Sequence, residues 1–227
     1  MTIQITNTST MAAKHIKVLV HGASGSGKTR LCATTGAKTL IISAEAGLLS
    51  LRGTNIDVFE IKNVDDLRAI YAHLLTDTTY SWICLDSISE VAETVLAAEL
   101  KLTKDPRKAY GELASTMSEM IRDFRDLPKN VYMSAKQDRV KDDVTGQVFF
   151  GPSAPGQKLG ASLPYFFDIV LALHNWKDET GAIQSAFQTQ RDDRYEAKDR
   201  SGALNLAEPA DLSKIYAKIM NQQTTGV

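Results

Sequence analysis

Residues 22–29 read GASGSGKT and come one residue after the largely apolar run IKVLV at 16–20. The stretch fits the phosphate-binding consensus G-x-x-x-x-G-K-[ST], and it lies between a strand pattern and a helix pattern, as that consensus requires. Its glycines let the backbone curl so that N–H groups point at phosphate oxygens, and the start of the following helix adds a favourable dipole. The sequence therefore predicts a nucleotide-binding loop, whereas a glycine-rich turn without a ligand is the weaker alternative.

The residue types of this loop have expected tasks. Lys28 is expected to reach the β and γ phosphates, and Thr29 is expected to offer its hydroxyl to Mg²⁺, which keeps water and phosphate oxygens as its other ligands. ATP and Mg²⁺ are therefore the predicted cofactors. The predicted nucleotide-binding residues are Gly22, Ser24, Gly25, Ser26, Gly27, Lys28, Thr29 and Arg30.

Two carboxylates follow later apolar runs at positions suited to the same site. Asp86 ends the run SWICLD, where the carboxyl end of a parallel strand faces the nucleotide, and it is the second predicted Mg²⁺ ligand. An aspartate there can also cap the helix that follows. Glu45 stands just past the run TLIIS and is a candidate base for the water that attacks ATP. Taken alone, a glutamate in such a turn is more often a solvated surface residue.

Along most of the chain, apolar runs of strand length alternate with segments of helical period, which predicts an α/β fold with a mostly parallel twisted sheet flanked by helices. We expect one domain over residues 14–222, with flexible ends at 1–13 and 223–227. Two polar segments, 103–110 and 136–158, are expected to be loops, and the length of the second favours a function. Strands are predicted at 15–21, 39–43, 58–61, 81–86, 130–134, 167–173 and 183–190, and helices at 28–35, 64–75, 88–102, 111–127 and 211–221.

The overall composition limits the function classes. Hydrophobic residues make up 43% and charged residues 23% of the chain, which is typical of a globular protein and disfavours disorder. The 26 basic and 27 acidic residues nearly cancel, so a nucleic acid would have to bind a local basic patch. No apolar run is long enough to cross a membrane, and Cys32 and Cys84 have apolar neighbours, which favours a cytoplasmic protein with reduced thiols. The four histidines lack the spacing of a zinc site.

The motifs, taken in the order in which they occur along the chain, resemble those of the RecA-like ATPases. The resemblance is closer to the small phage RecA-like proteins that are regarded as single-strand annealing recombinases. The resemblance covers about residues 15–205 and implies the bacterial host cytoplasm if a phage encodes the chain. Only the phosphate-binding loop is specific by itself, and the ordered set carries the resemblance. The set is GASGSGKT (22–29), IISAEAG (41–47), ICLDSIS (83–89), KAYGELASTMSEMIRDFRDL (108–127), NVYMSAKQDR (130–139), PGQKLGASLPYFFDIVLALH (155–174) and YEAKDRSGAL (195–204).

The resemblance implies roles for several residues. Glu45 becomes the catalytic base, and Gln137 becomes a sensor of the γ-phosphate that links ATP to the DNA-binding loops, with Lys136 as a close rival. Lys198 and Arg200 look like a Lys-x-Arg pair that reaches into the ATP site of a neighbouring subunit, so activity would require a ring or filament. A solvated pair on an edge strand is the alternative interpretation.

Binding of a single DNA strand needs cations for the phosphates and flat side chains for the bases, and the two polar segments offer both. The predicted DNA-binding residues are Lys104, Arg107, Lys108, Arg139, Lys141, Phe149 and Phe150. A simpler interpretation is also available, because basic residues favour helix ends and VTGQVFF at 144–150 could form a hairpin that buries one phenylalanine.

The sequence thus predicts an ATP-dependent recombinase or annealing protein that binds single-stranded DNA, assembles with itself and has a single-strand-binding protein as a further candidate partner. Two other classes stay open: a P-loop kinase that phosphorylates a small metabolite, and a nucleotide-gated adaptor that binds ATP and a partner protein without turnover. Release of phosphate to water, rather than transfer to an acceptor, separates the ATPase from the kinase. ATP bound without hydrolysis under any DNA condition would favour the adaptor.

Overall fold

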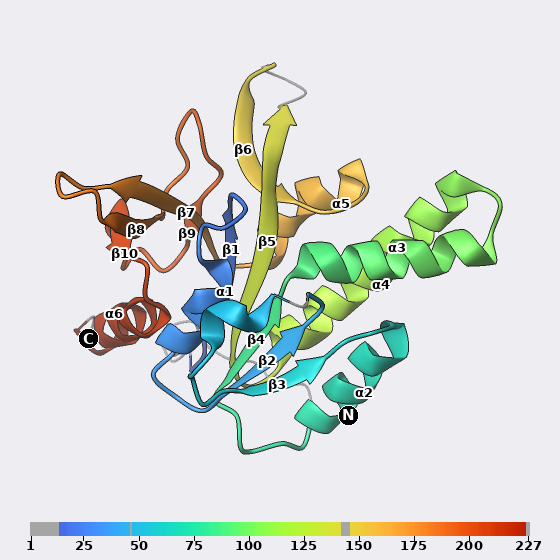
Figure 1. Cartoon of the computed structure of the whole chain (residues 1–227), viewed down its shortest axis with the longest axis horizontal. Helices are drawn as coiled ribbons and strands as arrows, with labels where there is room; N and C mark the ends of the chain where they lie inside the picture. The colour runs from blue at the N-terminus through green and yellow to red at the C-terminus, as the bar shows by residue number, and fades with distance from the viewer. Residues whose placement is uncertain (1–13, 46, 142–145, 226–227) are drawn as a thin grey trace, which may run out of the picture.

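The computed structural model describes residues 14–45, 47–141 and 146–225 (Figure 1). The strands are β1 (Lys17–Gly22), β2 (Thr39–Ser43), β3 (Asp57–Glu60), β4 (Trp82–Asp86), β5 (Asn130–Lys141), β6 (Val148–Ser153), β7 (Ile169–Lys177), β8 (Ile183–Gln188), β9 (Lys198–Asp199) and β10 (Ala207–Pro209). The helices are α1 (Lys28–Leu31), α2 (Val64–Leu74), α3 (Ile88–Leu102), α4 (Pro106–Asp126), α5 (Gln157–Ser162) and α6 (Leu212–Thr225), with short 3₁₀ turns at Cys32–Thr34, Leu48–Leu51 and Leu163–Phe166.

The strands form one mixed sheet. Their order is β10-β8-β7-β1-β5-β4-β2-β3, with β6 added to β5 and β9 added to β7. The strands from β7 to β3 run parallel, and β6, β8, β9 and β10 pair antiparallel with their neighbours. A mostly parallel sheet with helices on both faces confirms the predicted fold class. The carboxyl ends of β1, β4 and β5 meet at one edge of the sheet, which is where a ligand is expected in such folds.

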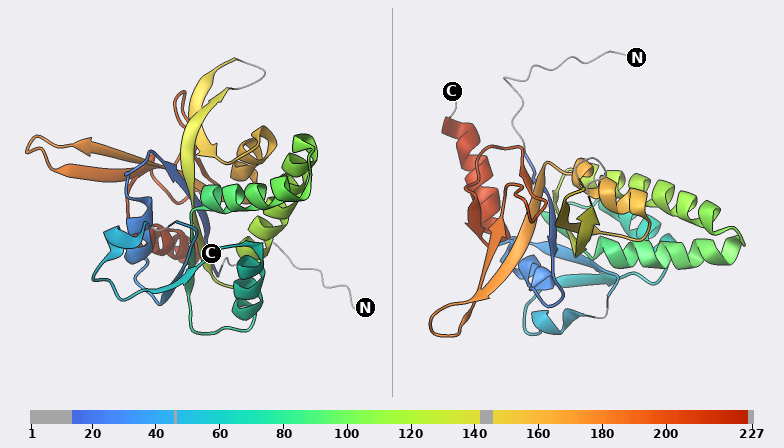
Figure 2. Two further views of the ribbon diagram at one scale, coloured as in Figure 1. Left: turned by 45° about the vertical axis from the view of Figure 1, so that its right-hand side comes forward. Right: turned by 90° about the horizontal axis from the view of Figure 1, so that it is seen from above.

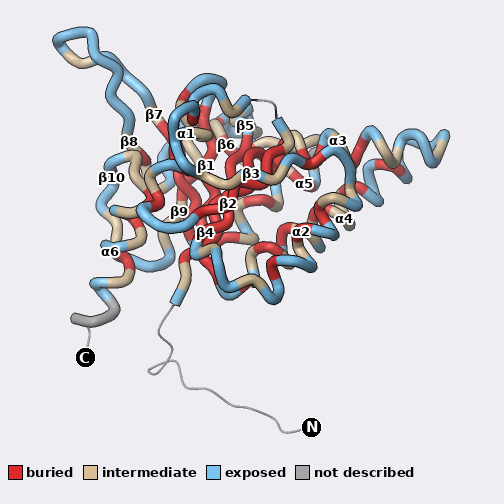
Figure 3. Tube along the Cα trace, turned by 60° about the horizontal axis from the view of Figure 1, so that its bottom comes forward, coloured by how far each residue is buried: buried red, intermediate tan, exposed pale blue. Residues whose placement is uncertain are grey.

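The helices cover both faces of the sheet. The view from above in Figure 2 shows α6 on the opposite side of the sheet from α3 and α4. One core lies between the sheet and α2, α3 and α4, and a second core lies under α6. Neighbouring residues of one strand serve different cores: Leu19 of β1 belongs to the first, whereas Val18 and Val20 belong to the second. Figure 3 shows buried residues gathered in these central strands. Burial on both faces explains why the strands are apolar almost without interruption.

Local signals set the starts of the long helices. Asn63 caps α2 in a capping box, in which its side chain accepts from the backbone N–H of Asp66 and the Asp66 carboxylate accepts from the N–H of Asn63. Asp105 caps α4, and Pro106 occupies the first turn, where its missing N–H costs nothing. α4 therefore begins at Pro106 rather than at the predicted Gly111. The prediction of a loop over 103–110 is wrong for all but its first three residues.

The predicted loop over 136–158 is also wrong in large part. β5 continues to Lys141, and β6 returns beside it, with Lys136 paired to Ser153. Residues 136–141 and 148–153 are called the β5–β6 hairpin below; it projects from the body of the molecule in Figure 1. A projecting ribbon has solvent near both of its faces, so it lacks the apolar alternation by which a strand is recognised in a sequence. Residues 142–145 of the predicted loop lie outside the described residues.

The last helix is longer than predicted. α6 ends at Thr225 rather than at 221, so it includes part of the tail that was expected to be flexible. The expected arm at 1–13 lies outside the described residues. β9 and β10 are only two and three residues long and were not predicted, and β6 was considered only as part of a possible hairpin at 144–150. Within the described ranges, none of the helices is both long enough and apolar enough to pass through a membrane.

Candidate functional site

The candidate site begins where β1 ends at Gly22 and the GASGSGKT loop turns into α1 at Lys28. Gly25 and Gly27 have φ angles of +73° and +98°, in the left-handed region that other residues rarely adopt. Gly22 is needed for a different reason, since a Cβ there would lie 2.8 Å from Ser26 Oγ. The conformation of the loop therefore depends on all three glycines.

Lys28 folds back across the loop that contains it. Its Nζ donates to the backbone oxygens of Gly22 at 2.8 Å and Ala23 at 3.0 Å. Burial lowers the pKa of this amine, although the carboxylates of Asp86 and Glu45 act in the opposite direction. A partly buried cation held by backbone carbonyls fits a polyphosphate ligand, because charged oxygens make stronger hydrogen bonds than carbonyls do.

The two predicted Mg²⁺ ligands meet although 57 residues separate them: Thr29 Oγ1 donates to Asp86 Oδ2 at 2.6 Å. Ser134 Oγ on the neighbouring β5 donates to Asp86 Oδ1, so two hydroxyls hold this buried carboxylate. Asp86 does not cap the next helix; Ser87 does, through its Oγ, which accepts from the N–H of Glu90. A hydroxyl and a carboxylate in contact beside a phosphate-binding loop fit Mg²⁺, which takes few protein oxygens and keeps several waters.

Glu45 is exposed, and its side chain is held by Ser87, the residue after Asp86. Its Oε1 accepts from Ser87 Oγ at 2.8 Å, and its backbone oxygen accepts from Ser43 Oγ at 2.6 Å. The side chain lines a cavity of about 510 Å³ together with the loop, Asp86 and Gln137. The structure therefore brings Lys28, Thr29, Glu45 and Asp86 to one cavity, as the sequence predicts.

A second cavity, of about 600 Å³, lies on the other side of the loop. The two cavities meet at the start of α1, where both are lined by Gly25, Gly27, Arg30 and Ser50. Asn175 of β7 contacts the loop from this second side, where its Nδ2 donates to Ser26 O at 3.0 Å. A nucleotide can therefore place its phosphates in the first cavity and its nucleoside in the second.

A comparison with known families agrees with this geometry. Residues 14–201, well over half of the chain, match the profile of the AAA domain family. The chain belongs to the AAA domain family. Membership implies a P-loop ATPase that binds ATP, usually with Mg²⁺, and the cavity and donor set described above fit both. Among curated proteins, no sequence matches the chain.

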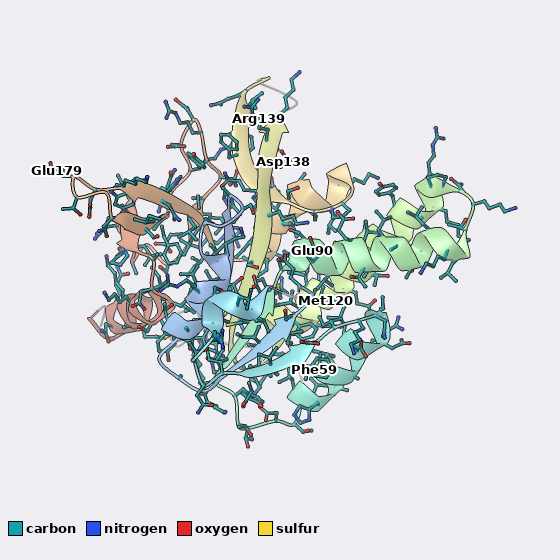
Figure 4. The ribbon with its side chains drawn as sticks, in the orientation of Figure 1. Phe59, Glu90, Met120, Asp138, Arg139 and Glu179 are labelled. Atoms are coloured by element: carbon teal, nitrogen blue, oxygen red, sulfur yellow. The ribbon has the colours of Figure 1, made fainter. Side chains whose placement is uncertain are left out.

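Both sensor candidates of this AAA domain line the first cavity. Lys136 forms an ion pair with Glu90, which Figure 4 labels at the start of α3, and the contact raises the pKa of the lysine amine. Gln137 lies beside His21 of β1, with its Oε1 3.2 Å from His21 Nδ1. Lys136 is thus connected to α3, whereas Gln137 is connected to the strand that leads into the phosphate-binding loop.

Lys198 and Arg200 lie away from the nucleotide cavity of their own AAA domain. β9 pairs with the amino end of β7, while the phosphate-binding loop lies at the carboxyl end of β1. Lys198 Nζ donates to Pro164 O at 2.5 Å, and Arg200 Nη1 donates to Asp168 Oδ1 at 3.1 Å. A role for this pair at an ATP site therefore requires a neighbouring subunit.

The basic residues that are predicted to bind DNA lie on two separate arms of the AAA domain. Lys104, Arg107 and Lys108 are exposed at the tip formed by the end of α3 and the start of α4 (Figure 1), which is called the α3–α4 tip below. Arg139 and Lys141 are exposed on the outer part of the β5–β6 hairpin, where Figure 4 labels Arg139. The structure does not bring the two groups together.

The two phenylalanines of the hairpin have opposite environments. Phe149 is buried, and the Arg191 guanidinium lies 4.5 Å from the centre of its ring. Phe150 is half-buried, and its ring stacks on Tyr195 with centroids 5.4 Å apart. Phe149 is therefore not available to a DNA base, and the alternative of a hairpin that buries one phenylalanine is confirmed. Base stacking by Phe150 stays a prediction.

Several residues around the site were not predicted from the sequence. His21, Ser134 and Asn175 contact candidate site residues as described above, and the Tyr132 hydroxyl donates to the backbone oxygen of Lys28 at 2.8 Å. All four lie on β1, β5 or β7, the strands around the phosphate-binding loop. Their neighbours are set by the order of strands in the sheet, which a single sequence does not reveal. A polar residue near the carboxyl end of an apolar strand is the signal that was available.

Proposed function

We propose that this AAA domain protein couples Mg²⁺-dependent ATP hydrolysis to the binding of single-stranded DNA, as a recombinase or annealing protein that acts as an assembly. Strand β5 carries the proposal. Ser134 on this strand holds Asp86, and Gln137 lines the nucleotide cavity. Arg139 and Lys141 follow on the same strand and are exposed on the projecting hairpin. One continuous strand thus connects the candidate metal ligands to a basic surface.

The residues of the site have separable tasks in hydrolysis. When bound, ATP supplies the phosphoryl group and Mg²⁺ screens the charge on its oxygens. Lys28 binds phosphate with the amine that is directed at Gly22 O and Ala23 O in the structure. Ser87 Oγ holds Oε1 of Glu45, which places this carboxylate to accept a proton from a water in the cavity.

Assembly is part of the proposal because Arg200 lies away from the cavity of its own chain. An arginine supplied by a neighbour would stabilise the charge on the transferring phosphoryl group. We expect Arg200→Ala to lower turnover at least about tenfold and to spare ATP affinity. A mixture of Arg200→Ala with Lys28→Ala protein should regain activity, because the second variant still donates Arg200 to intact sites. A wild-type rate for Arg200→Ala alone would remove the arginine from the mechanism.

The coupling to DNA is tested by measuring phosphate release and oligonucleotide affinity on the same protein. We expect an unstructured oligonucleotide to stimulate phosphate release, and its affinity to depend on nucleotide and to fall steeply with salt. Equal affinity with no nucleotide, with ADP and with a non-hydrolysable ATP analogue would overturn the proposal. Transfer of phosphate to a small acceptor would indicate a kinase, and ATP binding without hydrolysis would indicate an adaptor.

A further inference from the structure

His21 lies between the nucleotide cavity and the β5–β6 hairpin and has no part in the tasks given so far. It is the residue before the first glycine of the phosphate-binding loop, and it is fully buried. Both of its ring nitrogens have a partner. Nε2 lies 2.6 Å from the backbone oxygen of Glu196, and Nδ1 lies 3.2 Å from Oε1 of Gln137.

The chemistry of these partners decides which ring nitrogen of His21 carries the proton. Burial lowers the pKa of the ring to about 4, so the ring is neutral near pH 7 and holds one proton. A carbonyl oxygen can only accept, so that proton is on Nε2 and is donated to Glu196 O. Nδ1 is then an acceptor, and it requires a donor from Gln137.

The neutral ring therefore fixes the orientation of the Gln137 amide. In the structure Oε1 of Gln137 faces His21, but a half-turn of the amide exchanges this oxygen with the NH₂ without changing the shape of the side chain. An unprotonated Nδ1 selects the orientation in which the NH₂ faces His21. The amide oxygen is then left for the cavity that Gln137 lines. An oxygen in that place can accept a hydrogen bond from water, whereas it would repel a phosphate oxygen.

On its other side, His21 is connected to the hairpin through residues 194–196. Glu196 N donates to Phe150 O at 2.7 Å, and Phe150 N donates to Arg194 O at 2.6 Å. Phe150 is paired in turn with Arg139 across the hairpin. Hydrogen bonds thus run from Gln137 at the nucleotide cavity through His21 and Glu196 to Phe150, which lies opposite Arg139 in the hairpin.

We infer that His21 is a positioning residue with two functions: it holds Gln137 so that the amide oxygen orients the attacking water, and it transmits changes at Gln137 to residues 194–196 and the hairpin. The inference rests on the proposed coupling of ATP hydrolysis to DNA binding. It assigns Gln137 to water rather than to direct contact with the γ-phosphate. It also separates the two nitrogens of His21 by function, Nδ1 for hydrolysis and Nε2 for coupling.

Two substitutions test these functions one at a time, because the amide of asparagine reaches the position of Nδ1 and the amide of glutamine reaches that of Nε2. His21→Asn can keep the contact with Gln137 and loses the contact with Glu196. We expect it to reduce the ratio of DNA-stimulated to basal phosphate release to nearly one. His21→Gln can keep the contact with Glu196 and loses the contact with Gln137. We expect it to lower kcat about tenfold with and without DNA, while the ratio of DNA-stimulated to basal phosphate release stays at the wild-type value. Equal behaviour of the two variants would overturn the inference.

His174→Phe is the matched control. His174 is a second ring near the same segment, 4.3 Å from Tyr195 between ring centroids, but its Nε2 contacts Gln188 rather than the cavity. We expect this variant to keep the wild-type rate and ratio. Gln137→Met adds a second control. Combined with His21→Gln, it should lower kcat no more than either substitution does alone. Additive losses would show that the two residues act independently.

The protonation of His21 can be observed directly. In ¹⁵N-labelled wild-type protein at pH 7.5, the ring signals that His21→Gln removes should show a proton on Nε2 and none on Nδ1. A proton on Nδ1 would overturn the assignment of Gln137. Failure of the proposed function can be distinguished from failure of the inference about His21. If DNA does not change the ATPase rate of the wild-type protein, the proposed function is overturned. The ring signals and the kcat of His21→Gln then still test the contact between His21 and Gln137.

Discussion

The β5–β6 hairpin and the α3–α4 tip both present basic side chains, but they differ in how they are connected to the nucleotide cavity. The hairpin shares β5 with Ser134 and Gln137, and residues 194–196 attach it to His21. The α3–α4 tip lies beyond the 15 residues of α3, which span about 22 Å from the residues that follow Asp86. A change at the cavity can therefore alter the hairpin directly, whereas the tip can move only with a whole helix.

This difference implies two kinds of DNA contact. The hairpin should bind DNA in a way that depends on the bound nucleotide, because its base is formed by cavity residues. The α3–α4 tip should attract phosphates equally in every nucleotide state, since exposed lysine and arginine side chains act mainly through their charge. Whether a basic residue binds DNA in a nucleotide-dependent way is thus decided by its connection to the nucleotide cavity, and not by its charge alone.

The largest effect is expected from Lys28→Ala. Removal of the amine that binds phosphate should lower ATP hydrolysis at least about a hundredfold. It should also remove the nucleotide dependence of DNA binding, while binding by the α3–α4 tip persists. Phosphate release and fluorescence anisotropy of a labelled oligonucleotide measure the two effects. Lys62→Ala, a change at an exposed lysine before α2, is the control and should retain wild-type values.

The second effect concerns the stability of the hairpin. Phe149 is buried and Phe150 is half-buried, so Phe149→Ala should lower the free energy of unfolding by about 3 kcal/mol and Phe150→Ala by about 1 kcal/mol. Urea unfolding gives both values. Phe150→Ala should nevertheless weaken DNA binding more than its effect on stability explains, if its ring stacks on a base. Equal DNA affinity of Phe150→Ala and wild type would remove Phe150 from the interface.

The third prediction compares the two arms by charge reversal. Arg139→Glu with Lys141→Glu should weaken oligonucleotide binding about tenfold in the presence of a non-hydrolysable ATP analogue and much less with ADP. Lys104→Glu with Arg107→Glu makes the same change of charge at the other arm, and it should weaken binding to a similar degree with both nucleotides. If both double variants lose affinity in the same pattern, the connection through β5 does not control DNA binding.

The parts of the site that the sequence predicts are the ones set by local structure. The GASGSGKT loop depends on backbone conformations that glycine alone adopts easily, so its residue types reveal its shape. Asp86 and Glu45 follow apolar runs, and the carboxyl ends of parallel strands meet at one edge of the sheet. Each of these predictions needs only the residue and its neighbours in the chain.

The parts that were missed depend on neighbours in space. His21 acquires its partners from β5 and from residue 196, which lies 175 positions away in the chain. The β5–β6 hairpin was predicted to be a loop because its polar residues give no strand pattern, and the start of α4 was missed although Asp105 and Pro106 are a cap and first-turn pair. The first two errors follow from information that one sequence lacks, whereas the third could have been avoided.

The smallest expected effect is also the sharpest test of the difference between the arms. Each phosphate contact of a single-stranded nucleic acid contributes about 0.7 to the slope of log affinity against log salt concentration. Lys141→Gln should therefore lower the slope by about 0.7 with the ATP analogue and leave it unchanged with ADP. Lys104→Gln should lower it by the same amount with both nucleotides, because the α3–α4 tip has no direct contact with the cavity. Identical slope changes for Lys141→Gln in the two states would mean that the hairpin binds DNA as a fixed basic surface, and the two arms would then differ in position only.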